Sequence, residues 1–146
     1  MFALDLNPSI LTEDAEFVYF GPYMQYMSGV TDTQVKWVLE YRSDNPGIKA
    51  GDMFLANDPW VGAAHQMDVM LICPVFHEGG LFCWITNCLH QYDIGGITPG
   101  SFCPSARTWA ETAMASAGPW PCSKRGSAGP KRRLPRKTRS SKRSSR

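Results

Sequence analysis

The chain has 146 residues, of which 43% are hydrophobic and 12% aromatic, so it can form one modest domain and cannot be a large multidomain protein. Its net charge of +2 conceals two compositions. Residues 1–106 hold three basic and twelve acidic residues, a net charge of −9, whereas residues 107–146 hold twelve basic and one acidic residue, a net charge of +11.

The N-terminal segment, residues 1–28, mixes aromatic residues with glycine and proline and has no clear period. We expect an irregular segment there, with one short strand at most. Met1–Phe17 carries four acidic residues and no basic one, which is the wrong charge for a signal or transit peptide.

One amphipathic helix is predicted at about Asp32–Arg42. Thr31 and Gln34 have the spacing of a capping box, in which each side chain satisfies a free backbone N–H group at the helix start. The apolar positions of one helical face are Val35, Val38 and Leu39. Asn45-Pro46-Gly47 then ends the pattern, so we interpret the segment as a packing helix.

Strands follow the helix. Met53–Ala56 is predicted as a short strand, followed by a turn at Asn57-Asp58-Pro59. Two apolar runs, Val69–Phe76 and Leu81–Leu89, are separated by four residues that include two glycines, which is typical of a hairpin. Pro74 indicates that the first run is an edge strand or contains a bulge.

These elements predict an α+β fold: a short amphipathic helix with an antiparallel hairpin or sheet, from about Phe17 to Gly100. The basic tail, residues 107–146, is a separate low-complexity segment. From Ser123 to Arg146 its only aliphatic residues are Ala128 and Leu134, too few to offset the entropy of ordering the segment. We therefore expect the tail to be disordered.

The cysteines and the lengths of the apolar runs indicate the cellular compartment of the protein. The five cysteines include no C-x-x-C pair, so we expect reduced, mostly buried thiols. The apolar runs are far shorter than the roughly 20 residues that span a bilayer. The sequence thus predicts a cytoplasmic protein that has no membrane partner.

Four metal-capable side chains collect at the open end of the predicted hairpin: His65, Asp68, His90 and Asp93. With the turn centred between residues 78 and 79, Asp68 faces Leu89 and Met67 faces His90. Two imidazoles and one carboxylate form a common ligand set for a catalytic divalent metal. Asp93 would be a fourth ligand or a hydrogen-bond acceptor that fixes a histidine tautomer. The alternative is that these residues only make local hydrogen bonds at loop ends.

A glycine-rich loop follows, Asp93–Gly100. Gly95 and Gly96 would let backbone N–H groups approach an anion on a substrate, although the loop lacks the Gly-Lys-Ser/Thr of a P-loop. A simple series of tight turns is the alternative. His77, beside Glu78 in the hairpin turn, is interpreted as a solvated residue.

Several ordered motifs between residues 51 and 101 resemble the hydantoinase B/oxoprolinase family, which includes large subunits of acetone and acetophenone carboxylases. They are GDMFLANDPW from Gly51, AHQMD from Ala64, PVFHEG from Pro74 and LHQYDIGGITPGS from Leu89. The resemblance extends over about residues 29–106, a fragment of the family's length.

The resemblance implies an ATP-linked enzyme that hydrolyses a cyclic amide or carboxylates an aryl ketone, with a partner A-type subunit that handles ATP. The family's metal ligands, two histidines and one aspartate, fall on His65, Asp68 and His90. The metal would be Mn, Zn or Fe. Trp60 and the Gln91-Tyr92 pair look nearer to the aryl ketone carboxylases. Because most of the family's length is missing, we expect this fragment to be inactive alone.

Two alternatives remain for the function. The basic tail could bind nucleic acid through phosphates, although no aromatic residue lies within Lys131–Arg146 to stack on bases. The chain could instead be a non-catalytic interaction protein that pairs with the A-type subunit. The abrupt change of composition after Ala106 also suggests that the tail is an out-of-frame translation, which the coding DNA would test.

Overall fold

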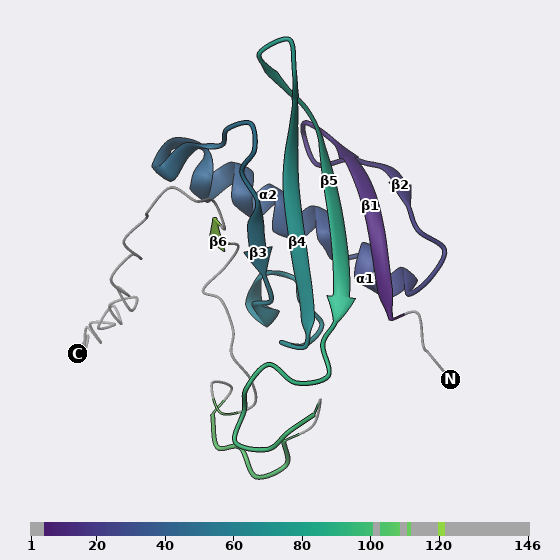
Figure 1. The fold of residues 1–146 in the computed structure, drawn as a ribbon, viewed down its shortest axis with the longest axis vertical. Coiled ribbons are helices and arrows are strands. Elements are labelled where there is room, and N and C mark those ends of the chain that lie inside the picture. The colour runs from purple at the N-terminus through teal and green to yellow at the C-terminus, as the bar shows by residue number, and fades with distance from the viewer. Residues whose placement is uncertain (1–4, 101–102, 109–110, 112–119, 122–146) are drawn as a thin grey trace, which may run out of the picture.

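The computed structural model describes residues 5–100, 103–108, 111 and 120–121. This part of the chain forms one antiparallel sheet with the strand order β2-β1-β5-β4-β3-β6, and helix α2 crosses behind it (Figure 1). The strands are β1 (Leu6–Thr12), β2 (Phe17–Phe20), β3 (Phe54–Ala56), β4 (Asp68–His77), β5 (Gly80–His90) and β6 (Trp120–Pro121). The helices are α1 (Gln25–Ser28), α2 (Thr31–Arg42), η1 (Ser43–Gly47) and η2 (Pro59–Val61). The α+β prediction is confirmed.

The hairpin of β4 and β5 is the centre of the sheet. Glu78 and Gly79 form its turn, both with positive φ, as a tight hairpin turn requires. Beyond the tip the register shifts between Val75 and Phe76. A bulge is therefore present near Pro74, but its extra residue, Phe82, lies on β5 and not on the predicted strand. β4 lies between β5 and β3 and is not an edge strand.

The prediction of an irregular N-terminal segment is wrong. Residues 6–20 form two strands, and β1 pairs with β5 along its whole length. The buried face of β1 includes Asn7 and Ser9 as well as Leu11, so the usual alternation of apolar and polar residues is hidden. Asn7 is accommodated because its Nδ2 donates to the carbonyl of Met24 at 3.1 Å.

Helix α2 packs on one face of the sheet. Val35 and Val38 are fully buried and Leu39 partly so, as their shared helical face predicts. The remaining members of this core come from the strands, from the turn between β1 and β2, and from α1: Leu11, Ala15, Met27, Phe54, Ala56, Met70, Ile72, Trp84 and Cys88. Trp84 is enclosed completely, and its indole N–H donates to the carbonyl of Glu13 at 3.1 Å.

The predicted capping box is wrong. Thr31 is the first residue inside α2, Val30 occupies the cap position, and no side chain caps the helix start. The Thr31 hydroxyl instead donates to the carbonyl of Met27 at 2.9 Å, and Gln34 is buried. Burial of the helix start against α1 explains the difference, because Thr31 satisfies an acceptor of the preceding turn.

Cys73, Cys83, Cys88 and Cys103 are free thiols, but only Cys88 is fully buried, whereas the other three are half-buried. Burial, with the nearby charges of Asp68 and Asp5, raises the pKa of Cys88 to about 12. No helix in the described ranges is long and apolar enough to cross a membrane. Most of the basic tail, including Cys122, lies outside the described residues.

Candidate metal centre

The open end of the hairpin positions the three predicted ligands. Asp68 begins β4 and His90 ends β5, and the two residues are direct partners across the ladder. The expected partner of Asp68 was Leu89, so the predicted register is wrong by one residue here, because the bulge shifts the pairing. His65 lies in the preceding turn, where its carbonyl accepts the N–H of Asp68 at 3.1 Å.

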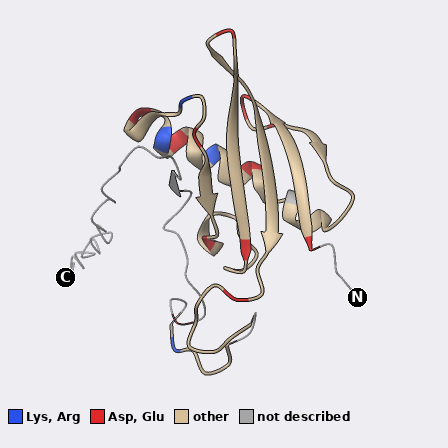
Figure 2. Ribbon diagram, viewed as in Figure 1, with Lys and Arg blue, Asp and Glu red and all other residues tan. Residues whose placement is uncertain are grey.

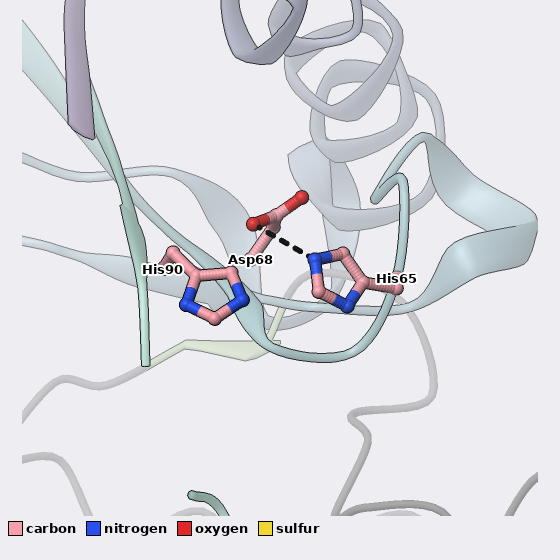
Figure 3. A group of neighbouring side chains, drawn as sticks. All are labelled: His65, Asp68 and His90. Carbon is pink, nitrogen blue, oxygen red and sulfur yellow. Dashed lines mark ion pairs between the residues drawn. The ribbon is translucent and has the colours of Figure 1, made fainter. Parts of the chain in front are cut away.

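Asp68, His65 and His90 offer ligand atoms that all lie within 4.8 Å of one another. Figure 3 shows the three side chains pointing toward a common centre, with His65 Nε2 3.4 Å from Asp68 Oδ1. The two imidazole rings lie 5.0 Å apart between centroids. This is the only such group of histidine, cysteine and carboxylate residues in the described part of the chain.

Burial makes Asp68 the most constrained member of the group. Its side chain is 3% exposed, compared with 36% for His65. Oδ2 accepts a hydrogen bond from the Tyr26 hydroxyl at 3.4 Å, whereas the buried Oδ1 has no hydrogen-bond partner. Burial raises the pKa of Asp68, and the nearby His65 and His90 oppose that shift. Burial therefore disfavours the charged form of this carboxyl group unless a positive charge lies beside it.

Two further residues complete the surroundings, and sequence reasoning missed both. Asp5 precedes β1, and its Oδ2 lies 3.8 Å from Nδ1 of His90. The backbone of Asp5 also accepts the N–H of His90 at 3.0 Å, which fixes the end of β5. Tyr26 belongs to α1, and burial together with the charge of Asp68 raises its pKa to about 12, so it stays a hydrogen-bond donor. No local motif marks either residue, since only the fold brings them to the site.

The donor set fits a divalent metal. Zn²⁺, Mn²⁺ and Fe²⁺ all accept imidazole nitrogen and carboxylate oxygen, and ligand bonds of about 2.0–2.2 Å put neighbouring donor atoms up to ~4 Å apart. Small side-chain rotations would bring atoms that lie within 4.8 Å to that separation. A cation would also satisfy the buried Oδ1 of Asp68.

The other predicted site residues lie outside this group. Asp93 is exposed, and its Oδ1 accepts the backbone N–H of Gly95 at 2.9 Å, which stabilises the turn. Gly95 has φ +81°, and Gly96 follows it on the exposed loop. His77 lies in the exposed hairpin turn, at the opposite end of β4 from Asp68. Trp60 and Tyr92 are both strongly exposed.

Comparison with known proteins shows the family of this chain. Residues 2–128 match the family model described as hydantoinase B/oxoprolinase. The chain belongs to the hydantoinase B/oxoprolinase family. This family member is 31% identical over 115 residues to 5-oxoprolinase 1 of Arabidopsis thaliana, and 35% identical over 107 residues to the acetophenone carboxylase delta subunit of Aromatoleum aromaticum.

The structure of this hydantoinase B/oxoprolinase chain also resembles that of the ATP-dependent caprolactamase from Pseudomonas jessenii, with a TM-score of 0.74 and 26% identity over 82% of the chain. Its matched part covers 20% of the caprolactamase chain, 9% of the Arabidopsis protein and 15% of the carboxylase subunit. The matches cover 78% and 73% of the present chain in the last two cases. The chain therefore spans a small fraction of the length of these relatives.

Proposed function

We propose that this chain is the metal-binding part of a B-type subunit of an ATP-dependent enzyme that hydrolyses cyclic amides or carboxylates ketones. The observation that carries the proposal is the convergence of His65, Asp68 and His90 around a buried carboxylate oxygen that lacks a hydrogen bond. Similarity to 5-oxoprolinases and to ketone carboxylase subunits supports the two classes of reaction.

His65, Asp68 and His90 would hold the ion. A divalent cation bound there activates water or stabilises negative charge on a carbonyl, enolate or carboxylate oxygen. Asp68 supplies the one negative charge of the donor set. Asp5 Oδ2 lies 3.8 Å from Nδ1 of His90 and would help to orient the imidazole ring. Tyr26 donates to Asp68 Oδ2 and thereby orients Oδ1 toward the histidines.

The glycine-rich loop after His90 is proposed to line the substrate side of the centre. Asp93 holds the loop turn through Gly95, and the adjoining Gly96 carries no side chain that would obstruct an approaching anionic group. In this role Asp93 would position the loop and would not contact the metal.

ATP would be handled by a partner, an A-type subunit. Support comes from similarity to subunits of acetophenone and acetone carboxylases, and from structural similarity to an acetone carboxylase with an ATP-dependent mechanism and to an ATP-dependent caprolactamase. Co-expression with an A-type subunit followed by affinity purification through one partner tests this assembly. Recovery of both chains in a fixed ratio is expected, and separation of the chains would contradict it.

Metal content tests the central proposal. Purified wild-type protein dialysed against Mn²⁺, Zn²⁺ or Fe²⁺ should retain about one equivalent of one ion, measured by elemental analysis. The double variant His65→Ala/His90→Ala should lose it. His77→Ala is the matched control, because it removes the third histidine of the chain, which lies at the far end of the hairpin. Equal metal content in wild type and double variant would overturn the proposal.

A further inference from the structure

The sheet has a second face that α2 does not cover. Burial alternates along β4, where Met70 and Ile72 point into the core and Leu71 and Cys73 point away from it. The register places Cys73 beside Ile85 of β5, and Ile85 beside Ile10 of β1. In Figure 1 this open face is turned toward the viewer, and no described element lies in front of it.

The open face is predominantly apolar and has no Asp, Glu, Lys or Arg side chain among the described strand residues. An antiparallel sheet with one solvated face normally has polar residues on that face, whereas charged residues are absent from this one among the described strands. Figure 2 shows Asp, Glu, Lys and Arg at strand ends, turns and helices. By alternation and register, the face consists of Leu6, Pro8, Ile10, Thr12, Tyr19, Leu55, Val69, Leu71, Cys73, Val75, Cys83, Ile85, Asn87 and Leu89.

The size of the open face suits a stable interface. Neighbouring strands lie about 4.8 Å apart, and each strand rises about 3.3 Å per residue. Five strands that average about seven residues therefore cover a footprint of roughly 24 by 23 Å. Solvent-exposed side chains stand above that plane, so their accessible area exceeds the footprint and approaches the ~800 Å² per partner of a standard interface. An apolar patch of this extent marks a surface that associates.

We propose that a second copy of this chain covers the open face, with the two sheets packed face to face about a two-fold axis. Two copies of this face would not repel each other, because neither carries a charged side chain on it. Aligned sheets pack about 10 Å apart, which lets Ile85 and its neighbours interdigitate with their counterparts. Ser123–Arg146 cannot supply such a cover, since it has only two aliphatic residues.

The dimer would leave the metal centre accessible. Asp68 and Cys88 lie on the same side of the sheet as the helix, and His90 follows Cys88 at the next position of that alternation. The proposed interface is on the other side. Dimerisation and metal binding are therefore independent proposals, and the failure of one leaves the other intact.

Analytical ultracentrifugation of the full 146-residue chain tests the interface. The wild type should sediment as a dimer of the 16.3 kDa chain at micromolar concentration. Ile85→Lys places charges in the apolar face and should raise the dimer dissociation constant at least about 100-fold. Tyr41→Lys is the matched control, because Tyr41 is an exposed aromatic residue on α2, the helix that covers the other face of the sheet. It should remain dimeric.

A second variant and a second measurement distinguish loss of the interface from misfolding of the chain. Ile10→Lys changes the neighbouring strand beside Ile85 and should also give monomers, with an unchanged far-ultraviolet circular dichroism spectrum. The melting temperature of the wild type should rise with protein concentration, and that of both Lys variants should not. A monomeric wild type would overturn the proposal and would indicate another cover, such as further B-type polypeptide. A dimer that persists in folded Ile85→Lys and Ile10→Lys would overturn it as well.

Discussion

Asp68 shows how one residue can oppose folding while it serves a site. Its carboxyl group is almost completely buried, and Oδ1 has no hydrogen-bond partner. A buried polar atom without a partner costs about 1–3 kcal/mol, and more when it is charged. The residue is therefore better explained by ligand binding than by its contribution to the metal-free fold.

Asp68→Asn should stabilise the metal-free protein at neutral pH by about 1–3 kcal/mol and abolish metal binding. Burial raises the pKa of Asp68, so the folded state keeps a proton that the unfolded state has already lost. This contribution to stability is present below the unfolded pKa near 3.8 and is lost as pH rises through the folded pKa. Urea unfolding between pH 4 and 8, in the presence of a metal chelator, measures how the free energy of unfolding depends on pH.

The pH series contains its own control. Wild-type stability should decline relative to Asp68→Asn as pH rises, and the difference should level off once Asp68 is ionised in both states. His77→Ala should follow the wild type, since residue 77 lies away from the site. If metal-free Asp68→Asn were less stable than the wild type at pH 7, this account of Asp68 would be contradicted.

The grouping of the three candidate ligands could be predicted from the sequence, but the residues around them could not. His65, Asp68 and His90 lie on or beside one hairpin, so local pairing rules bring them near one another even with the register wrong by one. Asp5 and Tyr26 reach the same place only because β1 pairs with β5 and α1 packs below it. Those are long-range contacts that no spacing in the sequence reveals.

At the scale of elements, prediction succeeded where side-chain patterns were strong. The hairpin and α2 have apolar residues at regular positions, and both were located to within about two residues. Strand β1 was missed because its buried face mixes Asn7 and Ser9 with Leu11. Pro74 indicated a bulge, but not which strand carries the extra residue, so the pairing beyond Val75–Phe76 was predicted one residue out of register.

The hairpin turn offers a test of local strain. Glu78 has φ +49° and Gly79 has φ +84°, a pair of positive values that favours Asn-Gly. Glu78→Asn should therefore increase the free energy of unfolding by about 0.5–1 kcal/mol, because Asn tolerates the left-handed region better than Glu. Thermal denaturation measures the gain. Glu78→Gln removes the charge but keeps the longer side chain, so it should give no comparable gain.

Metal affinity provides the complementary measurement for the turn variant. The turn lies at the opposite end of the hairpin from Asp68 and His90. Glu78→Asn should therefore bind metal as the wild type does. A stabilised turn accompanied by weakened metal binding would mean that strain at the tip is transmitted along the hairpin to the site.

At the scale of the whole molecule, the candidate metal centre joins segments that are distant in the chain. His65 comes from the turn before β4, Asp68 and His90 from the two hairpin strands, and Tyr26 from α1. Asp5 adds the start of the N-terminal strand. An ion bound to the three ligands would thus cross-link the middle of the sheet and would indirectly secure the N-terminal elements.

Metal binding should consequently stabilise the entire fold and not only the site. At a free metal concentration of 100 times Kd, linkage predicts a gain of about 2.7 kcal/mol in the free energy of unfolding. For a domain of this size that gain corresponds to a rise in Tm of about 10 °C or more. Differential scanning calorimetry with and without a chelator measures it. The rise should vanish in His65→Ala/His90→Ala and persist in His77→Ala. If saturated wild-type protein melted at the temperature of the chelated form, the ion would have to bind outside the folded centre, and these three residues would not be its ligands.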